Sequence, residues 1–202
     1  MMKRYRKIRN MQKMIIHLSA IMLILLPSVV FAQEPTVRTL KGYFAIGGGG
    51  GGDSESSNMR IEGGAYTTTQ GVNILFGLGM PFTLNRDDTP SSLHDYPCPH
   101  NDFTDLGNRK KGEEVGLYGK LGIAPIKNTG FFIFGMGGFT WGEEIQLSQS
   151  NVTRRYYTES ETTKTYGLVG GGIGYFPMQG HFTAQVQYDN RMGVTGSLGF
   201  AW

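Results

Sequence analysis

The sequence predicts an all-β protein, in which eight antiparallel strands close into an up-and-down barrel behind an export signal. Three observations support this. The chain begins with a basic and then apolar leader, apolar and polar residues alternate with a period of two along the rest, and glycine is in excess, at 31 of 202 residues. The single cysteine excludes a disulfide scaffold, and the hydrophobic content of 39% excludes a disordered chain.

The start of the chain has the features of a secretory signal peptide. A basic head precedes the apolar run 15–26, and the small residues Val30 and Ala32 follow. The run is shorter than the roughly 20 residues of a membrane-spanning helix, so a retained anchor is the weaker alternative. The head contains several methionines, which leaves the translation start open. We therefore divide the chain into a signal peptide, 1–32, and a β-barrel domain, 33–202.

The net charge changes once the leader is set aside. Six of the 19 basic residues lie in the leader, and none of the 16 acidic residues does, so the mature chain carries 13 bases against 16 acids, a net charge of −3. The basicity of the full chain therefore belongs to the export signal, and we expect no nucleic-acid partner.

The last two strands are the clearest. Within 194–202, Val, Gly, Leu, Phe and Trp occupy one face and Thr, Ser, Gly and Ala the other. Within 181–189, Phe182, Ala184, Val186 and Tyr188 oppose His, Thr, Gln and Asp residues. A sheet needs such alternation when its two faces meet different surroundings.

The remaining strands follow from the same period. They are expected at 40–48, 59–66, 72–82, 114–124, 131–143 and 163–176, although the last two mix apolar residues and glycine on both faces, so their inner and outer faces are not assigned. Short turns at 67–71, 125–130 and 177–180 alternate with longer loops at 49–58, 83–113 and 144–162, and a brief connection spans 190–193. This alternation describes an up-and-down sheet with both chain ends on one side.

The chemistry of the faces favours a membrane barrel over a soluble sandwich. In an outer-membrane barrel the apolar face meets lipid and the polar face lines the lumen. The best segments have the length of about 9–11 residues that a tilted strand needs to cross a bilayer. Aromatic residues near the strand ends suit the membrane interfaces: Phe82, Phe131, Trp141, Phe176, Tyr188, Phe200 and Trp202. The polar faces predict a packed interior network without a wide pore, made of Lys41, Arg60, Glu62, Glu114, Lys120, Gln185, Gln187 and Asp189.

The leader, the eight segments and the ending 194–202 together resemble the small outer-membrane β-barrel family of OmpA- and OmpX-like proteins. In that family the last strand ends in an aromatic residue and is a signal for the barrel-assembly machinery. The resemblance implies this role for Phe200 and Trp202, with Leu198 in support. The glycine usual in the signal would fall at Ser197, whereas the nearest glycine here is Gly196. The resemblance further implies an outer-membrane location, with membrane lipid, lipopolysaccharide and the assembly machinery as partners.

The 83–113 loop holds residues of metal-ligating types: His94, Asp95, Cys98, His100, Asp102 and Asp105. Their irregular spacing and the neighbouring prolines favour a solvated outer loop that contacts a surface ligand, so we predict no metal. The basic run 109–111 fits either lipopolysaccharide phosphates or solvent. The glycine run 47–52 lacks the Gly-Lys-Ser/Thr of a phosphate loop, so we predict no cofactor.

For function, the sequence favours a structural or surface-interaction role, in membrane integrity or loop-mediated contacts. A lipid-modifying barrel enzyme would need a nucleophile near a histidine and an acid, and His181 is placed near a turn at the opposite end from the long loops. We therefore predict no catalytic residues and no enzyme. A narrow channel and a soluble secreted β-sandwich are two further hypotheses that the sequence leaves open.

Overall fold

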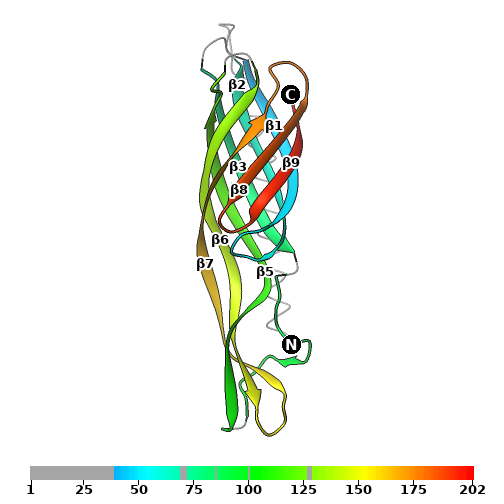
Figure 1. Ribbon diagram of the computed structural model, residues 1–202, viewed down its shortest axis with the longest axis vertical. Helices are drawn as coiled ribbons and strands as arrows, with labels where there is room; N and C mark the ends of the chain where they lie inside the picture. The colour runs from blue at the N-terminus through cyan, green and yellow to red at the C-terminus, as the bar shows by residue number, and fades with distance from the viewer. Residues whose placement is uncertain (1–38, 69–71, 85, 100, 127–128) are drawn as a thin grey trace.

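The computed structural model describes residues 39–68, 72–84, 86–99, 101–126 and 129–202. The predicted signal peptide lies outside these residues. Eight strands form a closed antiparallel ring (Figure 1): β1 (Thr39–Gly51), β2 (Ser56–Thr68), β3 (Ile74–Leu84), β5 (Phe103–Ile123), β6 (Phe131–Ser150), β7 (Tyr156–Tyr175), β8 (Phe182–Asp189) and β9 (Gly193–Ala201). A two-residue strand, β4 (Leu93–His94), pairs in parallel with the start of β7. The predicted eight-stranded up-and-down barrel is confirmed.

The ring closes between the first and last strands. Tyr43 of β1 pairs with Ala201 of β9, and the pairing continues to Gly50 opposite Val194. One residue further, Gly42 and Trp202 exchange two backbone hydrogen bonds, of 3.1 and 3.0 Å. The last residue of the chain is thus held by the first strand. We call this end of the barrel, where β1 begins and β9 ends, the short-turn end, and the opposite end the loop end.

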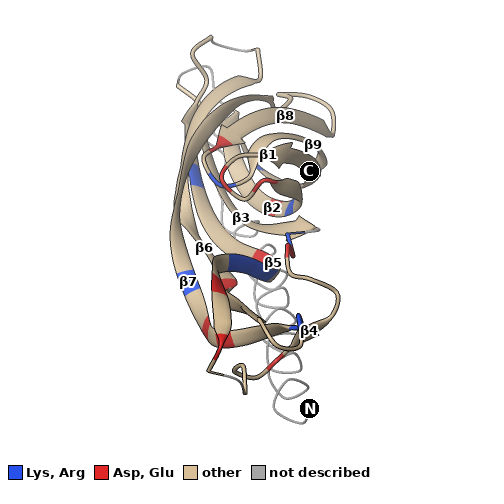
Figure 2. Ribbon diagram, turned by 60° about the horizontal axis from the view of Figure 1, so that its bottom comes forward, with Lys and Arg blue, Asp and Glu red and all other residues tan. Residues whose placement is uncertain are grey.

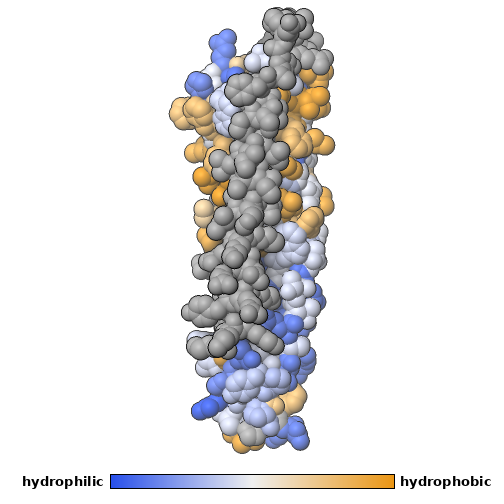
Figure 3. Space-filling view, turned by 180° about the vertical axis from the view of Figure 1, so that it is seen from behind, coloured by the Kyte–Doolittle hydropathy of each residue, from blue (hydrophilic) through white to orange (hydrophobic). Residues whose placement is uncertain are grey.

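The outward face of the barrel is apolar and the inward face is largely polar. Phe182 and Leu198 are 80% and 73% exposed, whereas Arg60, Glu62 and Lys120 are at most 1% exposed. Seen from behind, apolar side chains gather around the upper part of the molecule, where the barrel lies, while the lower part is mostly hydrophilic (Figure 3). This arrangement is the reverse of a soluble protein and excludes the soluble sandwich, whose apolar faces would be packed together. Within the described ranges, no helix has the length and apolar character needed to cross a membrane.

The strands of one wall are longer than predicted. β5 begins at Phe103, and β6 and β7 meet in a hairpin between Ser150 and Tyr156. The predicted loop 144–162 is therefore wrong for most of its length, and the predicted loop 83–113 is wrong from Phe103 onward. Polar residues predominate in these strand portions, and apolar residues such as Ile145 and Leu147 are too few to show the alternation of a barrel strand. Figure 1 shows β5, β6 and β7 extending well beyond the ends of β1, β2, β8 and β9.

Glycine shapes the inside of the barrel where rings need space. A Cβ atom added to Gly77 would overlap the hydroxyl of Tyr43, and one added to Gly79 would overlap the ring of Tyr118. No larger residue fits at either position without moving a buried tyrosine.

Candidate functional site

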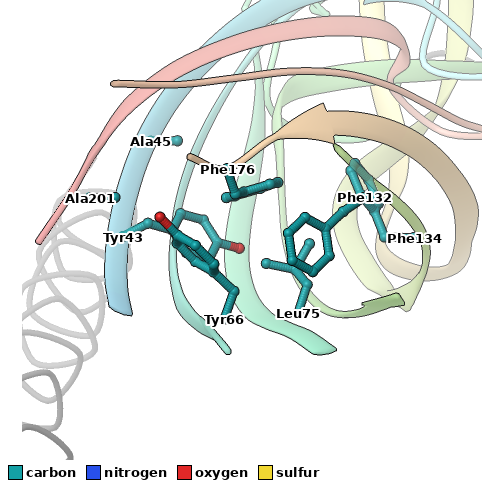
Figure 4. Packing of buried hydrophobic residues seen from close by; sticks show 8 residues of the cluster. All are labelled: Tyr43, Ala45, Tyr66, Leu75, Phe132, Phe134, Phe176 and Ala201. Carbon is teal, nitrogen blue, oxygen red and sulfur yellow. The ribbon is translucent and has the colours of Figure 1, made fainter. Parts of the chain in front are cut away.

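The short-turn end of the lumen is closed by an aromatic cluster, which we call the aromatic plug: Tyr43, Tyr66, Phe132 and Phe176. The ring of Phe176 meets those of Tyr43 and Phe132 edge-on, at centroid distances of 4.9 and 5.5 Å. The rings come from β1, β2 and β6 and from the end of β7, and point toward one another inside the barrel (Figure 4). The expectation of an interior filled by polar and charged side chains is thus wrong at this end. Phe176, expected in an outer girdle, instead lies inside the plug, because the strand face to which it belongs turns inward.

A polar cluster whose charges cancel lies further inside the lumen, around Glu62. The Lys120 ammonium lies 2.7 and 2.6 Å from the two carboxylate oxygens of Glu62. Tyr118 donates a hydrogen bond of 2.6 Å to the same carboxylate. Gln185 joins both charges, since its amide donates to Glu62 at 2.5 Å and its oxygen accepts from Lys120 at 2.7 Å. Each side chain of the cluster is hydrogen-bonded to another, which buried charges require to be stable.

Asp189 connects the lumen to the last turn of the chain. One carboxylate oxygen accepts from Arg60 at 2.7 Å, and both side chains of this pair are fully buried. The other oxygen accepts from the backbone N–H groups of Arg191 and Met192, at 3.0 and 2.7 Å. The guanidinium of Arg60 also lies over the Tyr118 ring, 5.4 Å from its centroid. One carboxylate therefore holds β2 and the β8–β9 turn together.

Glu114 forms a third cluster at the loop end, with two arginines that the strand pattern did not predict. Arg191 donates to both carboxylate oxygens of Glu114, at 3.0 and 2.6 Å, and Thr140 donates at 2.5 Å. The Nε atom of Arg86 lies 3.1 Å from Glu114, an ion pair not aligned for a hydrogen bond, while its Nη1 donates to the backbone oxygen of Glu143 at 3.1 Å. Both arginines lie outside the strands, so no alternation could have placed them in the lumen.

Two of the predicted interior residues do not join these clusters. Lys41 lies at the short-turn end, where its ammonium donates to the backbone oxygen of Gly180 at 3.1 Å. It precedes Tyr43 of the aromatic plug on β1, so the plug separates it from the lumen charges. Gln187 is buried, and its side-chain amide has no hydrogen-bond partner among the described residues.

Outside the barrel, three strand ends form what we call the protruding sheet: 103–113 of β5, 143–150 of β6 and 156–166 of β7. Basic positions of β5 lie beside acidic positions of β6, with Lys110 opposite Glu144 and Lys111 opposite Glu143. Figure 2 shows blue and red bands on neighbouring strands in this part of the molecule. This is where the basic run 109–111 lies, so acidic neighbours compensate much of its charge.

The segment 86–99, which we call the clamp loop, is fixed against this sheet. The Lys111 ammonium donates to Asp95 at 3.0 Å and to Glu161 at 3.1 Å, which joins the loop, β5 and β7. Burial favours the neutral amine, but these two hydrogen bonds and charges prevail and raise the pKa of Lys111. Asp87 accepts from the backbone N–H of Gly112 at 3.2 Å, and β4 adds backbone pairing to β7. The loop is thus held at several points.

A polar hollow of about 300 Å³ lies between the clamp loop and the sheet. Its lining combines carboxylates, hydroxyls, one ammonium and a small apolar surface: Asp87, Thr89, Pro90, Ser91, Leu93, Asp95 and Lys111. Such a lining offers hydrogen-bond donors and acceptors to a hydroxyl-rich ligand.

The residues of metal-ligating types in this region do not lie together. The His94 ring stacks on Tyr157 at 5.2 Å, Asp102 accepts from Asn151 at 2.7 Å, and Asp105 accepts from Gln146 at 2.9 Å. His100 lies outside the described residues. Across the ranges that the structure describes, no three His, Cys, Asp or Glu side chains gather in a way that could hold a metal ion.

The end of the chain packs against its neighbours at the short-turn end. The His181 ring stacks on Phe200 at 5.0 Å, and its Nδ1 atom lies 2.9 Å from the backbone oxygen of Ala201. The Trp202 indole lies over Gly42, 2.9 Å from where a Cβ atom would stand. Leu198, Phe200 and Trp202 are all exposed on the outer face. His181 thus lies beside the C-terminal strand, at the opposite end of the barrel from the clamp loop.

A closed ring of eight strands with an apolar outer belt and a charged, packed lumen defines the class of the small outer-membrane β-barrel proteins. No protein-family model matches the sequence, and comparison with curated proteins gives no match either. Solved structures of this class are similar. The attachment invasion locus protein Ail of Yersinia pestis aligns with a TM-score of 0.38 and 9% identity, over 82% of this chain and 97% of that one. Neisserial surface protein A aligns with a TM-score of 0.35 and 9% identity, over the same shares.

Proposed function

We propose that this protein is a membrane-anchored surface-interaction protein, in which the barrel holds the protruding sheet and the clamp loop outside the outer membrane. The observation that carries the proposal is the change in the polarity of the outer face along β5, β6 and β7. Their outer face is apolar within the barrel, with Ile133 and Leu121 exposed, and becomes polar beyond it, with Thr162 and Gln146 on the surface. The first portion suits hydrocarbon and the second suits water.

The fixed geometry of the protruding sheet supports a role in binding. A loop held by the Lys111 ion pairs and by β4 presents a preformed polar hollow, and preorganised sites lose less entropy on binding than mobile loops do. The lining suits a hydroxyl-rich ligand such as a saccharide. We place the surface ligand expected for the 83–113 loop at this hollow.

The lumen supports a structural role for the barrel. Three charge clusters and the aromatic plug lie inside it, which favours an anchor over a channel. We further propose Leu198, Phe200 and Trp202 as the signal read by the barrel-assembly machinery, and membrane lipid and lipopolysaccharide as the surroundings of the apolar belt.

The proposal is tested by removing the protruding sheet while keeping the barrel. In the test variant, short Gly-Ser turns replace 87–112 and 144–163, so that Arg86 of the lumen is kept, and the full chain is the reference. Both are folded into phospholipid vesicles, checked by heat-modifiable gel migration, and applied to a glycan array and to immobilised matrix proteins. We expect both to fold and only the full chain to bind. Equal binding by the two proteins, or binding by neither, would contradict the proposal.

A further inference from the structure

The outer wall of the barrel carries a hollow of about 440 Å³ over β3, β5 and β6, within the apolar belt. Phe76 and Leu121 form part of its walls, and three glycines form its floor: Gly119, Gly135 and Gly137. The backbone of Lys120 and Met136, whose side chains are buried on the lumen side, completes the lining. The hollow is therefore apolar and faces away from the lumen.

The floor glycines are not required by the packing of the barrel. A Cβ atom added to Gly135 would meet no atom within 4 Å, and the nearest atoms to added Cβ atoms at Gly119 and Gly137 lie at 3.9 Å. At Gly77, on the inner face, an added Cβ atom would overlap Tyr43. The inner glycine is thus needed by its neighbours, whereas the outer three leave a space that the barrel itself does not use.

Bulky side chains surround this space. Gly135 pairs with Leu121 on one side and Gly171 on the other, and Gly137 pairs with Val169. The surrounding exposed apolar residues are Phe76, Leu121, Ile133, Phe139 and Val169. Such a rim keeps the rigid wall of a second barrel away from the floor, whereas a single flexible hydrocarbon chain can enter.

We propose that this hollow is a binding site for one acyl chain of a phospholipid from the periplasmic leaflet. The inference rests on the proposed membrane location. The hollow is continuous with the hydrocarbon-facing belt, where an empty space would lose the dispersion contacts of its walls. Apolar surfaces within a bilayer associate through such packing, because lipid tails are as apolar as the side chains.

The position along the wall selects the leaflet. Gly135 lies nearer to Phe131, where β6 begins at the short-turn end, than to Trp141 near the loop-end limit of the belt. β1 begins and β9 ends on the short-turn side, and the short turns of an exported up-and-down barrel face the periplasm. The headgroup of the bound lipid would therefore lie beside the short turns.

The test fills the hollow and measures retained lipid. Full-length mature protein is folded into vesicles of phosphatidylethanolamine and phosphatidylglycerol, extracted in mild detergent and examined by native mass spectrometry. Gly135→Leu and Gly119→Leu fill the hollow from two different strands. Gly196→Leu on β9 is the matched control, because its added Cβ atom also meets nothing within 4 Å but lies outside the hollow. Heat-modifiable migration shows which variants fold, and the two filling variants substitute for each other if one does not.

We expect the wild-type protein and Gly196→Leu to retain one phospholipid, and the filling variants to retain it several-fold less. Equal retention by all folded variants would overturn the proposal, as would an absence of bound phospholipid on the wild-type protein. A lipopolysaccharide adduct, or a dimer that Gly135→Leu dissociates, would also overturn it, in favour of a different occupant. A failure of the wild-type protein to fold in vesicles would instead contradict the membrane location itself.

Discussion

The protruding sheet continues three of the eight strands of the barrel wall, yet opposite rules govern the charged residues of the two regions. In the barrel, charges such as Glu62 and Lys120 are fully buried and each contacts its partner at hydrogen-bond distance. In the protruding sheet, pairs such as Lys164 and Glu144 are partly exposed, at 3.5 Å. The surroundings, and not the strand, decide what an ion pair contributes. Water cannot solvate an unpaired charge in the barrel, whereas it can in the protruding sheet.

The largest expected effect comes from leaving one lumen charge unpaired. Glu62→Ala removes the carboxylate that faces the Lys120 ammonium, and breaking a buried pair in this way typically destabilises by about 3–5 kcal/mol. Lys164→Ala, which removes the exposed partner of Glu144 in the protruding sheet, should change stability by less than about 1 kcal/mol. Both are measured by urea unfolding from phospholipid vesicles, followed by tryptophan fluorescence.

The double variant Glu62→Leu with Lys120→Met is the control for this effect. Replacing both charges by apolar side chains of similar volume leaves no unpaired charge, although the Tyr118 hydroxyl and the Gln185 amide lose their partners, so part of the lost stability should return. If the double variant were as unstable as Glu62→Ala, the loss would not come from the unpaired ammonium.

The same contrast decides how much of the structure could be read from the sequence. The faces of β8 and β9 were predictable, because residues such as Gln185 and Val186 alternate between lumen and lipid without exception. At the start of β6, four apolar residues follow one another, Phe131 to Phe134, and two enter the lumen while two face outward. Hydrophobicity cannot separate the faces there, because the aromatic plug makes part of the lumen apolar too.

The lumen site was predictable only where it lies on strands. Arg60, Glu62, Lys120, Gln185 and Asp189 follow the alternation and lie inside the barrel. Arg86 and Arg191 reach Glu114 from a loop and a turn, where residue order carries no information on direction. In the protruding sheet the strands are mostly polar and bury only a few apolar side chains, such as Ile145 and Leu147, so these strands look like loops in the sequence.

The same charge placed on the barrel wall and on the protruding sheet should have different effects on stability. Leu198 projects from β9 into the apolar belt, and a lysine there should destabilise the barrel by roughly 2–4 kcal/mol if it lies near the bilayer midplane. Thr162→Lys, on the exposed part of β7, should stay within about 0.5 kcal/mol of the wild type. Unfolding from vesicles measures both. Equal effects at the two positions would contradict a boundary between membrane and water along these strands.

The smallest effect concerns pH and is confined to the clamp loop. Partial burial works against ionisation of Asp87, but hydrogen bonds from the hydroxyl and backbone N–H of Thr89 and from the backbone N–H of Gly112 lower its pKa. A carboxyl group with a lower pKa in the folded state contributes stability above its unfolded pKa, about 3.9 for aspartate, and loses this contribution as the pH falls through the folded value. Acid should therefore loosen the attachment of the clamp loop at Gly112, while Lys111 stays charged because its pKa is raised.

Pepsin digestion between about pH 4 and pH 2 would show this as increasing cleavage within 86–99, ahead of the barrel strands. In Asp87→Asn this carboxyl group is absent, so cleavage of this segment should depend less steeply on pH than in the wild type. A wild-type loop that resists pepsin equally across this range would show that Asp87 does not hold it.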